Sequence, residues 1–501
     1  MKRASRFATL PAWSRRDFLR ASGLAAAGLA LPSALLGGCG SSSGGTGGGQ
    51  QSTPLTVDPA TPWWLQNGYE PVFDELDVTD LTVKGHIPSE LSGLYVRNGS
   101  NPQAGDSPHW FFGDGMVHGV RFERGRAAWY RNRYIRTPLY VEGRGFDSGL
   151  PPVGGNNQSN VSCVWHGGKL LTSGEVGFPH RLNPGDLSTM GVHDFDGALL
   201  TSFTAHPKID PVTGYLHFFG YWFVPPYLTY GVADATGRVI HRQEIDVAAS
   251  TMIHSFAITE QDVIFWELPV LFDLAGAING ADNPFYWKAE YGARLGVMPL
   301  GGLASEIRWV EIDPCYVFHE VNAYREGDEV VLDVCRHDHM FANDDLDDTE
   351  LSLRRWRIGT GGAQLTFSEE IVTDLQFELP SHDRRFSGRK HRYGWFVESR
   401  PHDASVDLGG IGRFDYQTGR SLLWDAGLHR HANEAFFVPG GRGEGDGWLL
   451  TLVYDRAEDA TDLCILDAHR PDRGPVAEIR LPRRVPHGFH AAWVPAPSTR
   501  S

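Results

Sequence analysis

The stretch "DPVTGYLHFFGY" at residues 210–221 shows the pattern that decides the fold: a polar turn with a glycine, followed by an aromatic, strand-like segment. The same order returns in "VADATGRVIHRQEI" at 232–245 and in "FDYQTGRSLLWDAG" at 414–427. Turn and strand residues in this order are typical of β-hairpins. Hairpins that recur at irregular spacing indicate an all-β fold, either the blades of a propeller or the sheets of a sandwich.

The composition favours one large β-rich body. Gly (59 residues) and Pro (31 residues) are frequent, aromatic residues make up 12% of the chain, and long helical periodicity is hard to find. A seven-bladed propeller would give each blade about 60 residues, so we expect the extra length in loops over one face. The apolar segment 268–296 could be a cap over an active site or a membrane-facing patch.

The N-terminal residues predict export. "SRRDFLR" at 14–20 reads as a twin-arginine signal, and the apolar run after it ends in "LLGGC" at 35–39, which resembles a bacterial lipobox. Cys39 would then carry a lipid; the alternative is an ordinary cleavage site near it, because Gly37 is unusual in a lipobox. The expected location is the periplasm or, through the lipid, a membrane surface. The expected parts of the chain are a signal and lipobox at 1–39, a Gly/Ser-rich tether at 40–55 and a single propeller domain at 56–501.

Charge and cysteine content limit the partners and the covalent links. The net charge of -16 argues against nucleic acid, because no basic stripe is present to hold phosphates. Disulfides are possible in an exported protein, but the scattered spacing of the other cysteines does not require them. These cysteines are Cys163, Cys315, Cys335 and Cys464.

Four of the 21 histidines lie in or beside aromatic, strand-like segments, where an exposed side chain would be out of place. They are His206, His254, His319 and His490. They are too far apart in the chain for a local motif such as HExxH, so they could meet only around a central axis. A propeller provides that axis, since the inner strand of every blade faces the same channel.

Nine short motifs occur in an order that makes the chain similar to a known family. Taken together, they resemble the carotenoid cleavage oxygenases, the non-haem iron dioxygenases that include apocarotenoid oxygenases and lignostilbene dioxygenases. The motifs are "YVRNGSNP" (95–102), "GDGMVHGV" (113–120), "YRNRYIRT" (130–137), "SGEVGFPHRL" (173–182), "AHPKIDPVTG" (205–214), "HSFAITE" (254–260), "FHEVNAY" (318–324), "FELP" (377–380) and "VPHGFHAAW" (485–493).

This resemblance implies a seven-bladed β-propeller with loops and short helices forming a cap over the iron-binding face. It implies that the four histidines hold one Fe(II) per chain, with no catalytic residue beyond the metal centre. Glutamates that accept the remaining ring N–H of the histidines would orient the ligands and supply the missing negative charge. By motif these are Glu175, Glu378 and Glu444, with Glu434 as the competitor of Glu444 because Gly445 interrupts the usual acidic run.

The resemblance also implies a reaction, the oxidative cleavage of a conjugated carbon-carbon double bond by O2 to two carbonyl products. A carotenoid or apocarotenoid would suit a lipid-anchored protein with an apolar segment. Lignostilbene or other aryl-alkene cleavage is the alternative, although "YRNRYIRTPLYVEGR" at 130–144 lacks the lysine expected to grip a phenol. A non-catalytic exported propeller lipoprotein is a further alternative. Two departures from the family pattern lie beside expected ligands: Ser255 stands where Asp is common and Ala491 where Gly is common.

The sequence also suggests which aromatic residues line the site and where three further histidines lie. Aromatic candidates to line the substrate site are Phe256, Phe318, Phe489 and Trp493. We expect His337 and His339, which precede an acidic run, to mark a hydrated loop, and His487 to lie at the rim of the site.

Overall fold

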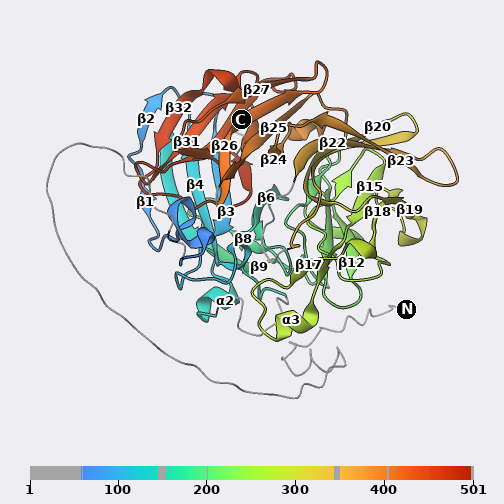
Figure 1. Ribbon diagram of the computed structural model, residues 1–501. Helices are drawn as coiled ribbons and strands as arrows, with labels where there is room; N and C mark the ends of the chain where they lie inside the picture. Colours follow the sequence, from blue (N-terminus) through green and yellow to red (C-terminus); the bar gives the residue numbers. More distant parts are fainter. Residues whose placement is uncertain are drawn as a thin grey trace, which may run out of the picture.

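The computed structural model describes residues 58, 60–144, 154–199, 201–342, 350–402 and 405–497. These residues form seven antiparallel sheets of four or more strands that follow one another around an axis, and the expected all-β, seven-bladed propeller is confirmed. In Figure 1 the chain passes from blue strands at the left through green strands at the lower right to red strands at the top. The predicted signal, lipobox and tether at 1–55, with Cys39, lie outside the described residues.

Five blades consist of four strands each, in chain order from the axis outward. Their first strands are the inner ones: β14 contacts β20, and β20 contacts β24. The second blade comprises β6 (Ser162–His166), β7 (Lys169–Ser173), β8 (His180–Leu182) and β9 (Thr189–Val192). The third comprises β10 (Lys208–Ile209), β11 (Leu216–Tyr221), β12 (Leu228–Ala233) and β13 (Val239–Ile245). The fourth comprises β14 (Ala257–Ile258), β15 (Asp262–Glu267), β18 (Ala293–Pro299) and β19 (Arg308–Ile312).

The fifth and sixth blades have the same order. The fifth comprises β20 (Tyr316–Glu326), β21 (Glu329–His337), β22 (Leu351–Gly359) and β23 (Thr366–Thr373). The sixth comprises β24 (Phe377–Ser381), β25 (Tyr393–His402), β26 (Ser405–Asp415) and β27 (Arg420–Trp424).

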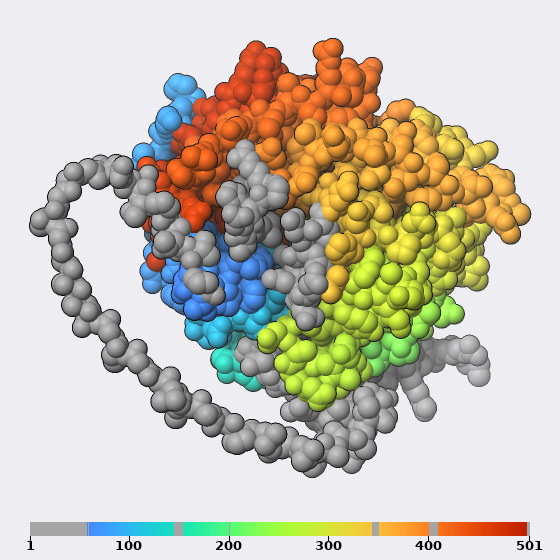
Figure 2. Space-filling view, in the orientation of Figure 1, coloured from blue at the N-terminus to red at the C-terminus, as the bar shows by residue number. Residues whose placement is uncertain are grey.

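Both ends of the described chain close the ring. The C-terminal strand β33 (Ala491–Pro495) becomes the inner strand of the first blade, and the N-terminal strand β2 (Thr82–Gly85) becomes the outer strand of the last. Blue and red parts therefore lie against each other in Figure 2. The first blade adds β3 (Gly93–Ser100), β4 (Gly115–Phe122), β5 (Ala127–Tyr134) and β1 (Asp77–Val78). The last adds β28 (Arg430–Ala432), β29 (Phe436–Pro439), β30 (Gly447–Asp455), β31 (Ala460–Asp467) and β32 (Pro475–Arg480).

The core lies between neighbouring blades and is rich in large aromatic side chains. Trp266, Trp356 and Trp395 are almost completely buried. The outer strand β13 instead alternates half-buried and exposed residues, because only one of its faces packs on the next blade. Cys163, Cys315, Cys335 and Cys464 are all buried with free thiols, so no disulfide forms among them.

The two short α-helices of the described residues lie in connections on the side where the inner strands begin, as expected for a cap. The apolar segment 268–296, which was expected to be a cap or a membrane-facing patch, contains β16 (Val270–Phe272), α3 (Leu274–Ile278) and β17 (Phe285–Trp287). Helix α2 (Pro138–Val141) lies on the same side as α3 in Figure 1. Among the described residues, no helix is long and apolar enough to cross a membrane. Within the described part of the chain, the 3-10 helices are η1 (Trp63–Leu65), η2 (Asn67–Tyr69), η3 (Trp110–Phe112), η5 (Ala289–Tyr291), η6 (Ala304–Glu306), η7 (Arg384–Phe386) and η8 (Pro471–Arg473).

Candidate metal centre

The four predicted histidines lie together where the inner strands of four blades begin. His206 precedes β10, His254 precedes β14, His319 is the fourth residue of β20 and His490 directly precedes β33. One potential ligand atom from each ring lies within 4.8 Å of the others. The Nε2 atoms of His206 and His254 are 2.9 Å apart, and the ring centroids of His206 and His490 are 4.4 Å apart. The propeller thus brings four histidines that are distant in sequence to one point on its axis.

Three of these imidazoles have a carboxylate at the Nδ1 atom. Glu378 Oε2 lies 2.6 Å from Nδ1 of His319, and Glu175 Oε2 lies 3.0 Å from Nδ1 of His254. The Glu378 contact is a hydrogen bond, which selects the tautomer of His319 with the proton on Nδ1 and leaves its Nε2 lone pair for a metal. Glu175 lies within ion-pair distance of His254 Nδ1 without hydrogen-bond geometry. The two glutamates predicted from "SGEVG" and "FELP" are therefore where a ligand-orienting role needs them.

The third carboxylate is Glu434, and the prediction of Glu444 was wrong. Glu434 Oε1 lies 3.1 Å from Nδ1 of His490, and its other oxygen accepts the backbone N–H of Ala491 at 2.7 Å. Glu444 instead accepts the backbone N–H groups of Arg392 and Tyr393, at 2.6 and 3.0 Å. The reason is topological. Glu434 precedes β29, an inner strand that contacts β33, whereas Glu444 lies in the turn between β29 and β30.

The backbone around two of these residues departs from a regular strand. The pairing of β20 shifts register on both sides of Glu320, and that of β24 shifts after Glu378. Leu379 has a φ of 49°, in the left-handed region that side chains other than glycine rarely occupy. Such irregularities re-aim side chains next to functional sites. Here they accompany the residues that surround the histidine cluster.

Burial and mutual proximity favour the neutral form of two of the rings. Burial lowers the pKa of His206 well below its usual value, and the neighbouring His490, His254 and His319 lower it further. Burial also lowers the pKa of His319. Burial alone would raise the pKa of Glu378, but the adjacent His319 ring holds it far below the usual range. A neutral imidazole beside an ionised carboxylate is the state that metal binding requires.

The donor set fits a divalent transition metal. The Nε2 atom of His319 is buried and has no hydrogen-bond partner in the described structure, although its Nδ1 is bound to Glu378. A buried imidazole nitrogen without a partner is costly unless a ligand occupies it. Four imidazoles suit iron, zinc, copper or nickel, and the three nearby carboxylates offset the charge of the ion.

Aromatic side chains lie on the cap side of the cluster. Phe318 makes an edge contact with the His254 ring, at a centroid distance of 5.2 Å, and Phe489 packs on Trp110 and Phe111 at 4.6 and 5.9 Å. Trp110 and Phe111 were not predicted, because they lie on η3 in a loop far in the sequence from the four candidate ligand histidines.

Two of the aromatic candidates pack elsewhere. Phe256 lies in the core against Phe219 and Phe265. Trp493 packs on Phe122 within the first blade, because alternate residues of β33 face opposite sides.

Two further histidines differ from their predictions. His337 is the last residue of β21, is 9% exposed, and its Nε2 lies 3.3 Å from Glu378 Oε1, so a hydrated loop was the wrong expectation. His487 is buried, its Nδ1 lies 2.9 Å from the side-chain nitrogen of Asn433, and its ring packs against Tyr69 and Tyr454, so it lies between η2 and the last blade and not at the rim.

The chain is a seven-bladed propeller with a cluster of four histidines that could hold a metal ion, three of them with a carboxylate beside Nδ1. The model of the family described as retinal pigment epithelial membrane protein matches residues 69–495, and the chain belongs to that family. It is 36% identical to a carotenoid 9,10(9',10')-cleavage dioxygenase of Crocus sativus, over 86% of this chain and 89% of the relative.

Two solved structures share the whole fold. Lignostilbene dioxygenase of Pseudomonas brassicacearum superposes with a TM-score of 0.81 and 28% identity, over 88% of this chain and 100% of the other. Cobalt-substituted apocarotenoid oxygenase of Synechocystis superposes with a TM-score of 0.77 and 27% identity, over 86% of this chain and 98% of the other. The similarity extends over the described propeller and is not confined to the site.

Proposed function

We propose that this protein is an iron-dependent oxygenase that cleaves a conjugated carbon-carbon double bond with O2 and releases two carbonyl products. The proposal rests on one observation, the cluster of four histidines whose potential ligand atoms lie within 4.8 Å of one another. These are His206, His254, His319 and His490. Membership of a family whose relatives are named as alkene-cleaving dioxygenases supports the same reaction.

The residues of this chain have three tasks in such a reaction. The four histidines would hold one ferrous ion, which supplies the redox chemistry with O2. Glu175, Glu378 and Glu434 keep the rings in the ligating tautomer and compensate charge through their contacts with Nδ1. Phe318 and Phe489 provide an apolar surface beside the cluster against which a flat, conjugated substrate can pack while water is excluded.

We propose a carotenoid or apocarotenoid as the substrate class. The Crocus sativus relative is named for carotenoid cleavage and the Synechocystis structure for apocarotenoid oxygenation. Aryl-alkene cleavage is the second candidate, because the Pseudomonas brassicacearum structure is named a lignostilbene dioxygenase. The segment 130–144 favours the first, since it contains no lysine for a phenol.

The deciding experiment is anaerobic loading of the purified protein with Fe(II), followed by exposure to O2 and a panel of carotenoids, apocarotenoids and stilbenes. Liquid chromatography with mass spectrometry should find paired aldehydes or ketones from one substrate class, and His319→Ala should give none. A fully loaded protein that converts no member of the panel would favour a non-catalytic propeller.

We also propose export by the twin-arginine route and attachment to a membrane through Cys39. The support is the sequence at 14–20 and 35–39. A Cys39→Ser variant should move from the membrane fraction to the soluble periplasmic fraction, whereas an unchanged distribution would remove the anchor from the proposal.

A further inference from the structure

A second polar cluster lies directly beside the histidines, and neither ligation nor the ring-orienting carboxylates use it. It consists of Lys208, Ser255 and Glu320. Lys208 follows His206 by two residues, Ser255 follows His254 by one, and Glu320 follows His319 by one. Each member therefore belongs to the same inner segment as one ligand, and the three come from three different blades.

All three side chains are joined to one another. Glu320 Oε1 accepts a charge-assisted hydrogen bond from Nζ of Lys208, and Glu320 Oε2 accepts the hydroxyl proton of Ser255 at 2.7 Å. Lys208 Nζ also lies 3.3 Å from Ser255 Oγ. Bonds of this kind, made to charged groups, are about twice as strong as neutral ones. The cluster thus ties together the ligand-bearing segments of three successive blades.

The geometry of β20 shows how the carboxylate reaches the axis. In a regular strand His319 and Glu320 would point to opposite faces. The pairing of β20 with β21 shifts register on both sides of Glu320, and Glu320 reaches the blades of Lys208 and Ser255 while His319 reaches Glu378. The irregular strand lets two consecutive residues both serve the centre of the ring.

The ion pair between Lys208 and Glu320 is largely shielded from solvent, so the loss of either charge would be costly. The side chain of Glu320 is 7% exposed and that of Lys208 is 20% exposed. A buried ammonium without its carboxylate would be a costly, mobile positive charge close to a divalent ion. Glu320 therefore fixes the position of Lys208 and cancels its charge near the histidines.

We propose that Glu320, with Ser255 and Lys208, is a positioning cluster that sets the spacing of His206, His254 and His319 for the metal. This inference rests on the proposed metal site. The geometry also predicts that a carboxylate at position 255 can replace that of Glu320. Because Ser255 Oγ lies 3.3 Å from Lys208 Nζ, an aspartate at position 255 would place its carboxylate against the same ammonium group.

The test measures Co(II) binding to the full chain by competition with a chelator, together with the Co(II) absorption spectrum. Glu320→Gln should weaken Co(II) binding by about tenfold to a hundredfold, the range for residues that support metal ligands, and should change the spectrum. The double variant Ser255→Asp/Glu320→Gln should recover most of the affinity and the original spectrum.

The matched control is Glu326→Gln on the same strand. Glu326 is 41% exposed and pairs with Lys390 and Arg357 at the far end of β20, so its loss should leave Co(II) binding unchanged. Melting of the metal-free proteins separates a loss of fold from a loss of positioning, because a purely structural role would lower the melting temperature without altering the Co(II) spectrum.

The outcomes are distinguishable. If the wild-type chain binds no Co(II), the proposed metal site itself is wrong. If the wild-type chain binds Co(II) and Glu320→Gln binds it with the same affinity and spectrum, the positioning cluster is refuted. A double variant no better than Glu320→Gln would likewise refute the carboxylate interchange.

Discussion

At the residue scale, three glutamates lie beside an Nδ1 atom of the cluster, and two of them, Glu378 and Glu434, form hydrogen bonds there that determine which nitrogen the ring presents. His254, His319 and His490 each have such a neighbour, while His206 lies with its Nε2 against that of His254. Because the side chain of Glu378 is only 14% exposed and Glu434 is buried, removing either charge should change both the orientation of a ring and the electrostatic balance around the ion.

Glu434 and Glu444 make a matched pair for testing this arrangement. Glu434→Gln should weaken metal binding by about tenfold or more, because an amide cannot replace the carboxylate that accepts the His490 N–H and compensates charge. Glu444→Gln should bind metal like the wild type, since its remaining carbonyl oxygen can still accept the N–H of Arg392. Titration with Co(II) measures both. Equal losses in the two variants would contradict the assignment of Glu434.

The same pair shows what a linear pattern can and cannot predict. The histidines stand in aromatic, strand-like segments, and that context is visible in the chain. The partner of His490 is not, because it depends on which inner strand lies next to β33 after the ring has closed. His337 is a similar case: the acidic residues after it suggested a loop, but pairing with Tyr316 extends β21 to His337 and buries the ring.

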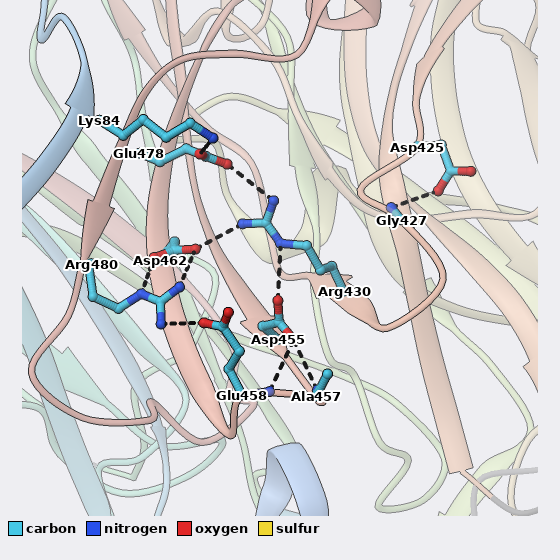
Figure 3. A network of polar contacts seen from close by, with 10 residues as sticks. All are labelled: Lys84, Asp425, Gly427, Arg430, Asp455, Ala457, Glu458, Asp462, Glu478 and Arg480. Atoms are coloured by element: carbon cyan, nitrogen blue, oxygen red, sulfur yellow. Dashed lines mark hydrogen bonds and ion pairs between the residues drawn. The ribbon is translucent and has the colours of Figure 1, made fainter. Parts of the chain in front are cut away.

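At the element scale, the inner strands position the site and the two terminal strands hold the ring closed. β2 pairs with β32 over four residues, and β33 pairs with β3 over five. Figure 3 shows a network of charges on the last blade, in which Asp462 accepts from Arg430 at 2.9 Å and from Arg480 at 2.6 Å. Glu478 extends the network from Arg430 to Lys84 of β2.

Asp462→Ala should destabilise the closure, because two guanidinium groups lose a carboxylate that is only 9% exposed. The expected loss is about 2 kcal/mol in the free energy of unfolding, less than for a fully buried pair because Arg480 is 40% exposed. Chemical denaturation measures it. Lys84→Ala is the control: its side chain is 84% exposed, and its surface ion pair with Glu478 should contribute nothing measurable. Unfolding midpoints that match in the two variants would contradict a role for Asp462 in closure.

Sequence patterns predicted the elements better than their irregularities. The hairpin turns and aromatic strands at 210–221, 232–245 and 414–427 indicated blades, and the structure places each of them in a blade. The register shifts at Glu320 and Glu378 were not predictable, since they depend on how each inner strand pairs with its neighbour and what lies across the axis.

At the scale of the whole molecule, the ring explains why the end of the chain takes part in the site. Because β33 is the inner strand of the first blade, the residue before it, His490, comes to lie beside histidines from the middle of the sequence. The four-histidine cluster is therefore complete only when the C-terminal strand β33 has closed the ring.

The central claim is that these four histidines bind one metal ion. Crystals of the full chain, loaded anaerobically with Fe(II), allow a direct measurement by anomalous scattering at the iron absorption edge. We expect one strong peak per chain, between the rings of His206, His254, His319 and His490, and no such peak in His319→Ala. A loaded protein with no peak at this position, or with its iron bound elsewhere on the chain, would contradict it.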